Sequence, residues 1–513
     1  MANPLWDAIA AGQPNPEHTL VKFADETTLT AAEFFSLSAQ LAHVLTHCGV
    51  QPGDRVAVQV PKSIEALALY IACVRSGAVF LPLNTAYTSA ELEYFIGDAT
   101  PSLLVMNPAD AEQGKSLAES VDAEIHTLGD NHNGSLMDLA EKQSTEYKTV
   151  DRDATDLAAI LYTSGTTGRS KGAMLSQHNL LSNTLSLVEA WQFTESDVLL
   201  HALPIFHTHG LFVASNTVFI SGASMLFVPK FDIDEMITLL PKVTSLMGVP
   251  TFYTRLLNDK RFTKDLASNM RLFISGSAPL LAETHVEFEE RTGHRILERY
   301  GMTETNMNTS NPYEGSRIAG TVGVALPQVQ IRIMNSETSE PCPVGEVGML
   351  EVKGPNVFSG YWKMPEKTKE EFTDDGFFIT GDLAMMDENN YVTIVGRGKD
   401  LIITGGFNVY PKEIELVLDE CEGVVESAVV GAKHPDFGEA VVAFVVDGHS
   451  SNQPEPYAVN PEFEANLIQQ ANDKLAKFKQ PKRILFVSEL PRNTMGKVQK
   501  NELRQRTESL FNH

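Results

Sequence analysis

The sequence predicts an α/β protein: a large N-terminal domain of two α/β subdomains plus a small β-barrel-like subdomain, then a smaller C-terminal α+β domain. Three observations support this fold class. The chain has 513 residues, far more than one compact domain of about 100 to 150 residues. Amphipathic helical segments alternate with short apolar runs from about residue 35 to residue 320. After about residue 322 the pattern becomes β-rich.

The N-terminal region contains two kinds of segment in alternation. FFSLSAQLAHVLTHCGV and SIEALALYIACVRSG have the period of amphipathic helices, whereas RVAVQV, AVFLPL and SLLVMN are short apolar runs typical of buried strands. The alternation returns between about residues 155 and 320, where AAILYT, SMLFVP, SLMGVP and RLFISG indicate strands. Since strands that alternate with helices form parallel sheets, we expect two α/β subdomains here.

The last third of the chain has a different texture. VQIRIMN, GMLEVKG and YVTIVGR are β-rich, which fits a small barrel-like region. Beyond residue 398 come a helix-like PKEIELVLDECEG, the strand-like SAVVGAK and AVVAFVV, the polar linker GHSSNQPEPYAVNP and a helix leading to FKQPKRILFV. We therefore expect an N-terminal domain over residues 1–397 and a C-terminal domain over residues 398–513.

The composition limits the partners and the compartment. The 66 acidic against 40 basic residues give a formal charge of −26, which disfavours binding to nucleic acid or to an anionic membrane. The four cysteines lie far apart, without a CxxC pair or a Cys/His spacing typical of zinc, which favours reduced thiols. Neither a secretory signal nor an apolar run of about 18 residues is visible. We expect a cytoplasmic protein without membrane insertion, either a monomer or a weak homo-oligomer.

The strongest local signal is the string Tyr162-Thr163-Ser164-Gly165-Thr166-Thr167-Gly168-Arg169-Ser170-Lys171-Gly172, directly after the apolar AAIL. Glycines allow backbone geometries closed to other residues, the hydroxyl and N–H groups suit phosphate oxygens, and Lys171 adds a positive charge. The string is no Walker A loop, because six residues, not four, separate Gly165 from Gly172 and Lys171 is followed by glycine. A solvated turn is the alternative, but the complete string favours a phosphate-binding loop.

This string resembles the phosphate-contacting loop of the adenylate-forming superfamily of acyl-CoA synthetases, peptide-synthetase adenylation domains and luciferases. The segment Tyr300-Gly301-Met302-Thr303-Glu304 resembles a second superfamily motif, in which the threonine contacts the adenylate phosphate and the glutamate helps to hold Mg²⁺. The resemblance implies that ATP and AMP are bound by residues of both motifs: Thr163, Ser164, Gly165, Thr166, Thr167, Gly168, Lys171, Tyr300, Gly301, Met302 and Thr303.

Segments near the C-terminus resemble the same superfamily. Asp382 matches the aspartate that holds the ribose hydroxyls, Arg397 follows at a family-like distance, and Lys497 in PRNTMGK matches the catalytic lysine. The resemblance implies that the C-terminal domain is mobile and rotates about a hinge at Lys399 between adenylation and thioester formation. Gly405-Gly406 would then line the path of the CoA pantetheine. Taken alone, Asp382 fits a turn aspartate and Lys497 a solvated surface lysine.

Adenylation itself explains why these residue types are needed. A carboxylate that attacks the α-phosphorus of ATP brings two anions together, so cations must neutralise the approach and stabilise the transition state. Lys497, Mg²⁺ held partly by Glu304, and the donors of the loop and Thr303 would supply this. ATP and CoA are thus the implied co-substrates and Mg²⁺ the implied cofactor.

Several segments are more similar to malonyl-CoA synthetases, a group within this superfamily: HALPIFHTHGLF, RLFISGSAPL, ERYGMTETNMNTSNPYEG and LPRNTMGKVQKN. Malonate has a second carboxylate, whose burial without a partner costs several kcal/mol, so its pocket should contain a cation. Arg317 is the first candidate and Arg299 the second, although each also fits a surface ion pair. His207 and Ser277 resemble further pocket positions; His207 and His209 also fit core histidines, and their spacing is weak evidence for a metal.

The implied activity is an AMP-forming ligase of fatty acid metabolism that converts malonate, ATP and CoA into malonyl-CoA, AMP and diphosphate. A methyl branch changes affinity by only ~1 to 3 kcal/mol in an apolar pocket, so acceptance of methylmalonate stays open. One alternative is a synthetase for another short or medium carboxylic acid, and another is acyl transfer to a carrier protein. A non-catalytic homologue that binds ATP or CoA is disfavoured because Lys497 and Glu304 are both present.

Overall fold

The computed structural model of the chain describes residues 2–163, 170–404, 407–435, 437–448, 461–493, 496–508 and 510–511. The chain divides into two compact units. Unit 1 comprises Met1–Ile331 and Val352–Phe378, and unit 2 comprises Arg332–Glu351 and Ile379–His513. Unit 2 thus contains residues on both sides of residue 397, and the domain boundary expected there stays a prediction.

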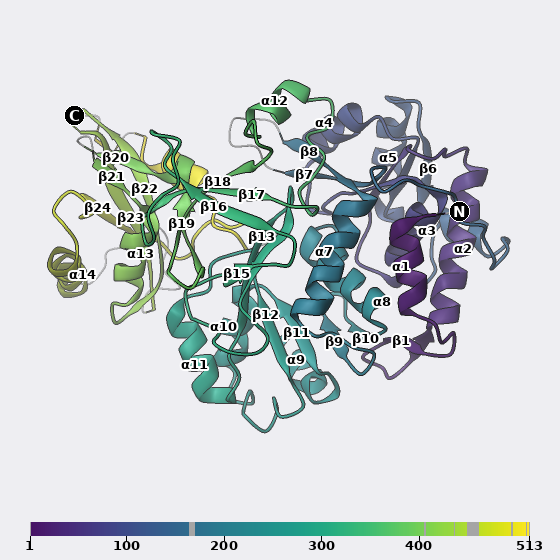
Figure 1. Ribbon diagram of the computed structural model, residues 1–513, viewed down its shortest axis with the longest axis horizontal. Helices are drawn as coiled ribbons and strands as arrows, with labels where there is room; N and C mark the ends of the chain where they lie inside the picture. The colour runs from purple at the N-terminus through teal and green to yellow at the C-terminus, as the bar shows by residue number, and fades with distance from the viewer. Residues whose placement is uncertain are drawn as a thin grey trace. The chain divides into compact units, whose positions relative to one another are not determined.

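The first sheet of unit 1 has six strands in the order β6-β5-β3-β4-β7-β8 (Figure 1). Neighbouring strands are parallel except β7 and β8, which are antiparallel. The predicted strands RVAVQV, AVFLPL, SLLVMN and AAILYT all lie in it. The strands are β3 (Arg55–Gln59), β4 (Val79–Pro82), β5 (Leu103–Met106), β6 (Glu124–Thr127), β7 (Leu157–Thr163) and β8 (Lys171–Ser176).

The second sheet of unit 1 has nine strands in the order β15-β14-β13-β12-β11-β9-β10-β1-β2. Its central strands are parallel, and β2, β14 and β15 at the two edges pair in antiparallel fashion. The two predicted α/β subdomains are therefore confirmed. The strands are β1 (Thr19–Lys22), β2 (Thr28–Thr30), β9 (Val198–His201), β10 (Ser224–Phe227), β11 (Ser245–Gly248), β12 (Leu272–Ser275), β13 (Leu297–Met302), β14 (Asn306–Ser310) and β15 (Val324–Ala325).

The helices of unit 1 follow the sequence pattern closely. The first predicted helix is α2 (Ala31–His47), which begins with a capping box of Thr30 and Glu33. The second is α3 (Ile64–Ser76), whose residues are apolar on almost every side and are buried along its whole length. The others are α1 (Pro4–Gly12), α4 (Ser89–Ala99), η1 (Pro108–Asp110), α5 (Ala111–Glu119), α6 (Ser135–Ala140), α7 (Gln177–Ala190), α8 (Thr217–Ser221), α9 (Ile233–Leu239), η3 (Leu240–Lys242), α10 (Pro250–Asn258), α11 (Ala282–Thr292), α12 (Pro365–Glu370) and the π-helix η2 (His209–Asn216).

The β-rich region after residue 322 forms a four-stranded sheet in the order β16-β17-β18-β19. The boundaries between the two units fall within strands of this sheet. A five-stranded sheet of unit 2 has the order β21-β20-β23-β22, with β24 parallel to β23. Valines and alanines of its two long strands, β22 and β23, belong to two apolar clusters. The elements are β16 (Gln330–Met334), β17 (Gly348–Lys353), β18 (Phe378–Met386), β19 (Val392–Arg397), η4 (Gly398–Asp400), β20 (Ile402–Thr404), β21 (Phe407–Val409), α13 (Pro411–Asp419), β22 (Val424–His434), β23 (Gly438–Asp447), α14 (Pro461–Lys474), β24 (Arg483–Phe486) and α15 (Lys500–Arg506).

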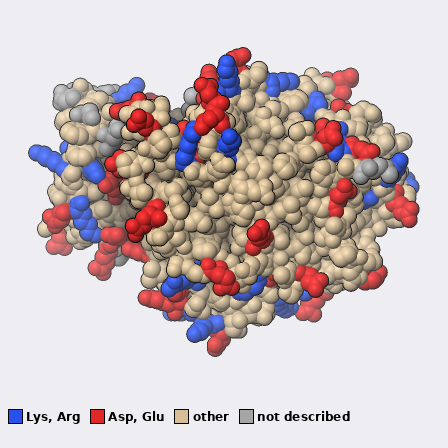
Figure 2. All heavy atoms as spheres, in the orientation of Figure 1, with Lys and Arg blue, Asp and Glu red and all other residues tan. Residues whose placement is uncertain are grey.

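On the face drawn in Figure 2, acidic and basic side chains are interspersed, and neither sign forms a continuous field. Among the residues that the structure describes, every helix is too short or too polar to cross a membrane.

Candidate functional site

A buried arginine dominates the first group of predicted site residues. Arg299 extends from β13, and only 3% of the residue is exposed. Its guanidinium packs over Gly276, where a β-carbon would lie 2.4 Å from Arg299 Cζ, so a larger residue at this position would displace the guanidinium. Within the described part of the chain, Arg299 Nε and Nη2 have no hydrogen-bond partner. Burial lowers the pKa of Arg299 to about 9, which still leaves the side chain charged at neutral pH.

A histidine on a π-helix lies beside this arginine. His209 begins η2, a rare helix type that is frequent at functional sites. Its Nδ1 is 3.2 Å from Ser277 Oγ, while its buried Nε2 has no hydrogen-bond partner among the described residues. Burial first, and then the positive charge of Arg299, lower the pKa of His209 well below its usual value. When Ser277 donates to Nδ1, the neutral ring carries its proton on Nε2 and offers a donor.

The other predicted acid-site residues differ in their surroundings. Ser277 follows β12 with φ 72°, a left-handed conformation that sets the direction of its side chain. The half-buried His207 accepts the backbone N–H of His209 at 3.3 Å. Arg317 instead donates to the backbone carbonyls of Pro312, Tyr313 and Arg295 at 2.8–3.2 Å. Arg299, His207 and Ser277 are thus gathered around His209, whereas the guanidinium of Arg317 already binds its own backbone.

A second group of residues surrounds the start of the phosphate-binding string. Thr163 ends β7 and donates to Glu304 Oε1 at 3.3 Å, and the hydroxyl oxygen of Tyr361 lies 3.1 Å from the same carboxylate oxygen. Tyr361 also lies 2.7 Å from Glu371 Oε2. Lys171, the first residue of β8, donates to Glu371 Oε1 at 2.8 Å, and its Nζ lies 3.9 Å from the centre of the Tyr361 ring. Ion pairs and hydrogen bonds therefore connect two carboxylates, a lysine and two hydroxyls.

The electrostatics of this second group favour a charged Glu371 and a neutral Tyr361. Burial tends to raise the pKa of Glu371, but hydrogen bonds from Lys171 and Tyr361 outweigh it and lower that pKa. Burial and the neighbouring carboxylates Glu304 and Glu371 raise the pKa of Tyr361, so the phenol keeps its proton and acts as a donor. The carboxylate of Glu304 is buried, with 6% of the residue exposed.

The remaining nucleotide-motif residues lie at the end of β13. Tyr300, Gly301 and Met302 are the last residues of the strand, and Thr303 follows it directly. A β-carbon on Gly301 would lie 1.9 Å from the carbonyl oxygen of Asn306, so this position requires glycine. The predicted contacts Ser164, Gly165, Thr166, Thr167 and Gly168 lie outside the described residues.

In unit 2 the structure brings together the polar residues predicted near the C-terminus. Asp382 on β18 is paired in register with Arg397 on β19, and Arg397 Nε lies 2.9 Å from Asp382 Oδ1. Loss of hydration, followed by the positive charge of Arg397, lowers the pKa of Lys497 to about 8, and Asp382 partly opposes this effect. Lys399 lies in η4, and Gly405 and Gly406 are outside the described residues.

Three side chains of these groups were not predicted as site residues. Tyr361 and Glu371 lie in a segment without a recognisable motif, and nothing local indicates that they meet Glu304 and Lys171. His209 was considered only as a core or metal-binding histidine. Its one sequence signal is its place in PIFHTHGLF, two residues after His207.

Comparison with known proteins gives consistent matches over almost the whole chain. The family model of AMP-binding enzymes matches residues 8–362, and that of the AMP-binding enzyme C-terminal domain matches residues 413–497. A malonate–CoA ligase of Arabidopsis thaliana is 36% identical over 487 residues, which cover 90% of this chain and 79% of the relative. A mitochondrial malonate–CoA ligase of Mus musculus is 33% identical over 538 residues, covering 97% and 88%. The crystal structure of ATP-bound MatB from Rhodopseudomonas palustris superposes with a TM-score of 0.95, at 55% identity and full coverage of both chains.

Proposed function

Since the chain belongs to the family of AMP-binding enzymes, we propose that it is an AMP-forming ligase that joins malonate to coenzyme A through a malonyl-adenylate. Two malonate–CoA ligases, from Arabidopsis thaliana and Mus musculus, are among its relatives, and both match over most of their length. The observation that carries the choice of acid is the buried guanidinium of Arg299 with its unpartnered Nε and Nη2.

The pocket around Arg299 is suited to an anion that the substrate brings. A buried guanidinium without an anionic partner is costly, and a carboxylate with charge-assisted hydrogen bonds offsets this cost. When Ser277 donates to Nδ1 of His209, the ring is held in place and presents a neutral N–H donor at Nε2. A monocarboxylic acid would bury an apolar tail here and leave Arg299 unpaired. The arrangement therefore supports a short dicarboxylate, with Arg299 rather than Arg317 as its partner.

The reaction we propose has two steps. One carboxylate oxygen of malonate forms a bond to the α-phosphorus of ATP, and the bond from that phosphorus to diphosphate breaks. The CoA sulfur then bonds to the acyl carbon, AMP leaves, and the thiol proton passes to solvent. The second carboxylate takes no part in bond making; Arg299 and His209 would hold it, which fixes the orientation of the reacting carboxylate.

The second group of residues is suited to the phosphates. Glu304 presents a buried carboxylate beside the hydroxyls of Thr163 and Tyr361, the hard oxygen donors that Mg²⁺ prefers. When bound, Mg²⁺ supplies positive charge to the triphosphate. We propose that Glu304 holds this ion, that Lys171 and Thr303 contact phosphate oxygens, and that Asp382 and Arg397 bind the ribose. Lys497 would be the catalytic cation of adenylation, with Lys399 as the hinge and Gly405-Gly406 on the CoA path.

The test is a carboxylic acid panel on Arg299→Met, a substitution that removes the charge at similar length. We expect kcat/KM for malonate to fall about 10²- to 10³-fold, because removal of one partner of a buried charge pair costs 2 to 5 kcal/mol or more. Activity with acetate and butyrate should be unchanged or higher. Diphosphate release measures adenylation, and thioester formation measures the second step. An equal loss with all three acids, in a variant that unfolds at the wild-type temperature, would contradict the assignment.

A cytoplasmic location and a monomeric or weakly associated state also remain proposals. Acceptance of methylmalonate is measured in the same panel.

A further inference from the structure

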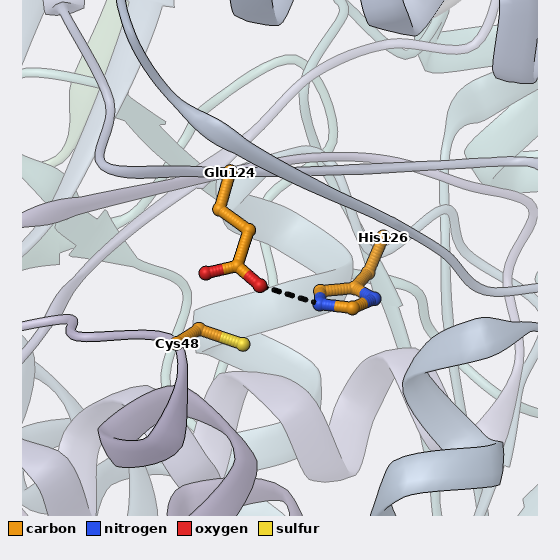
Figure 3. A group of neighbouring side chains, drawn as sticks. All are labelled: Cys48, Glu124 and His126. Atoms are coloured by element: carbon orange, nitrogen blue, oxygen red, sulfur yellow. Dashed lines mark hydrogen bonds and ion pairs between the residues drawn. The ribbon is translucent and has the colours of Figure 1, made fainter.

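A cluster of metal-ligating side chains lies outside the site described above, at the edge of the six-stranded sheet. Cys48 immediately follows α2, and Glu124 and His126 belong to the edge strand β6. One ligand atom from each side chain, the thiol sulfur, a carboxylate oxygen and an imidazole nitrogen, lies within 4.8 Å of the other two (Figure 3). We propose that these three residues bind a zinc-like divalent cation, with water completing a tetrahedral site.

The types of ligand decide the class of metal. Thiolate sulfur, imidazole nitrogen and carboxylate oxygen are the ligands of zinc, whereas magnesium and calcium prefer oxygen alone. Zinc lies about 2.0 to 2.3 Å from such atoms, so ligand atoms at tetrahedral angles are roughly 3.3 to 3.8 Å apart. The Glu124 side chain is 46% exposed, so its rotation can shorten the longer separations.

The local structure orients two of the ligands. Glu124 and His126 are two residues apart on one strand, so their side chains leave the same face. His126 Nδ1 lies 3.0 Å from Ser135 Oγ, and Nε2 lies 3.1 Å from Glu124 Oε1. Ser135 in turn accepts the backbone N–H of Thr127 at 3.0 Å, which fixes its position. A hydrogen bond at the second ring nitrogen is the usual support of a metal-binding histidine, and it leaves Nε2 to face the metal.

The position of Cys48 makes the site a connection between two elements. Helix α2 packs against α6, and α6 packs against β6, so the end of the helix and the sheet edge are already neighbours. A cysteine thiol keeps its proton at neutral pH unless a cation stabilises the thiolate. Metal binding forms a metal–sulfur bond and releases the thiol proton to solvent, with no change of oxidation state.

The experiment is a Co²⁺ titration of the full chain without nucleotide, followed by displacement with Zn²⁺. The wild-type protein should bind one equivalent of Co²⁺, with a sulfur-to-cobalt charge-transfer band that Zn²⁺ removes and Mg²⁺ does not. Cys48→Ser should lose the band, and Glu124→Gln and Ser135→Ala should weaken binding by about tenfold or more. Cys342→Ser, which removes another partly exposed thiol, is the matched control and should behave as wild type.

The readouts are independent of catalysis. Proton release on Zn²⁺ binding, measured calorimetrically in buffers of different ionisation enthalpy, should be present in wild type and lost in Cys48→Ser. Metal-free wild type and variants are compared by thermal unfolding, so a folding defect is recognised separately. Absence of stoichiometric binding by the wild-type chain, or equal Zn²⁺ affinity of Cys48→Ser and Cys342→Ser, would overturn the proposal.

Discussion

The two charged clusters of unit 1 balance their charges in opposite ways. Around Glu304 and Glu371, the protein itself supplies the partners, because Lys171 and Tyr361 reach the carboxylates at hydrogen-bond distance. Around Arg299, two N–H-bearing nitrogens are buried without a partner among the described residues. The pKa values follow this difference: neighbours lower the pKa of Glu371 and favour its charge, whereas burial lowers the pKa of Arg299 and disfavours its charge.

This difference indicates where the substrate contributes charge. In the second group, the ion pair between Lys171 and Glu371 is complete within the protein and stabilises the contact between β8 and the end of α12. A buried cation without an anion is a site that becomes stable only when an anionic ligand arrives, which is the logic of a preorganised binding pocket. We therefore expect that removal of a charge from the Lys171–Glu371 pair lowers stability. Removal of the Arg299 charge should lower activity with malonate without lowering stability.

The largest expected effect is that of replacing Lys497, a cation of unit 2. Lys497→Ala should lower the rate of adenylation about 10²- to 10³-fold, as the loss of one preorganised charge does in other enzymes, and leave thioester formation from added acyl-adenylate nearly intact. Pyrophosphate exchange measures the first step, and a stopped assay with synthetic malonyl-adenylate and CoA measures the second. An equal loss in both steps would contradict a role of Lys497 in adenylation alone.

The same lysine predicts a pH dependence. With a pKa lowered to about 8, Lys497 carries its positive charge below that pH and loses it above, so adenylation should decline as pH rises through about 8. Lys497→Arg should keep any remaining activity across this range, because arginine stays charged. An unchanged decline in Lys497→Arg would assign the titration to another group.

The next effect tests the paired cluster through stability. Glu371→Gln removes the carboxylate that Lys171 and Tyr361 contact, and it leaves a half-buried cation without its anion. We expect a loss of about 1 to 3 kcal/mol in the free energy of unfolding, measured by urea denaturation. Glu370→Gln, on the neighbouring exposed residue, is the matched control and should lie near wild type. A Glu371→Gln variant as stable as its control would show that the pairing does not stabilise this cluster.

Arg299→Met should change the free energy of unfolding in the opposite direction from Glu371→Gln. Replacing a buried, unpaired charge by an apolar side chain of similar length is expected to leave stability unchanged or to raise it by about 1 to 2 kcal/mol in the absence of substrate. Malonate should also stabilise the wild-type protein against heat and fail to stabilise this variant. A clear loss of stability in Arg299→Met would mean that the two clusters do not differ as described.

The smallest effect is expected at Arg317. Its guanidinium donates to three backbone carbonyls, so Arg317→Gln should cost about 1 kcal/mol of stability. Any loss of activity should be similar for malonate, acetate and butyrate. A selective loss of malonate use would return Arg317 to the role that sequence reasoning first suggested for it.

The fold could be predicted from the sequence because the patterns that indicate helices and strands are local. The helix period of SIEALALYIACVRSG predicts α3, and short apolar runs such as RVAVQV predict buried strands, since each pattern reflects the environment of its own segment. The motif around Thr163 and that around Glu304 are recognisable for the same reason, and the structure then joins them by a hydrogen bond.

Packing between strands and helices brings distant residues together, and sequence spacing carries no record of it. From sequence, Arg317 and Arg299 are two arginines near one motif; burial and hydrogen bonding distinguish them. Tyr361 and Glu371 acquire a role only because the segment around α12 reaches Glu304 and Lys171. The cysteines show no zinc spacing, yet the end of α2 lies beside the edge strand and places Cys48 next to Glu124 and His126. The sequence alone determined the fold class and the adenylate-forming family, whereas packing determined the partner of each charge.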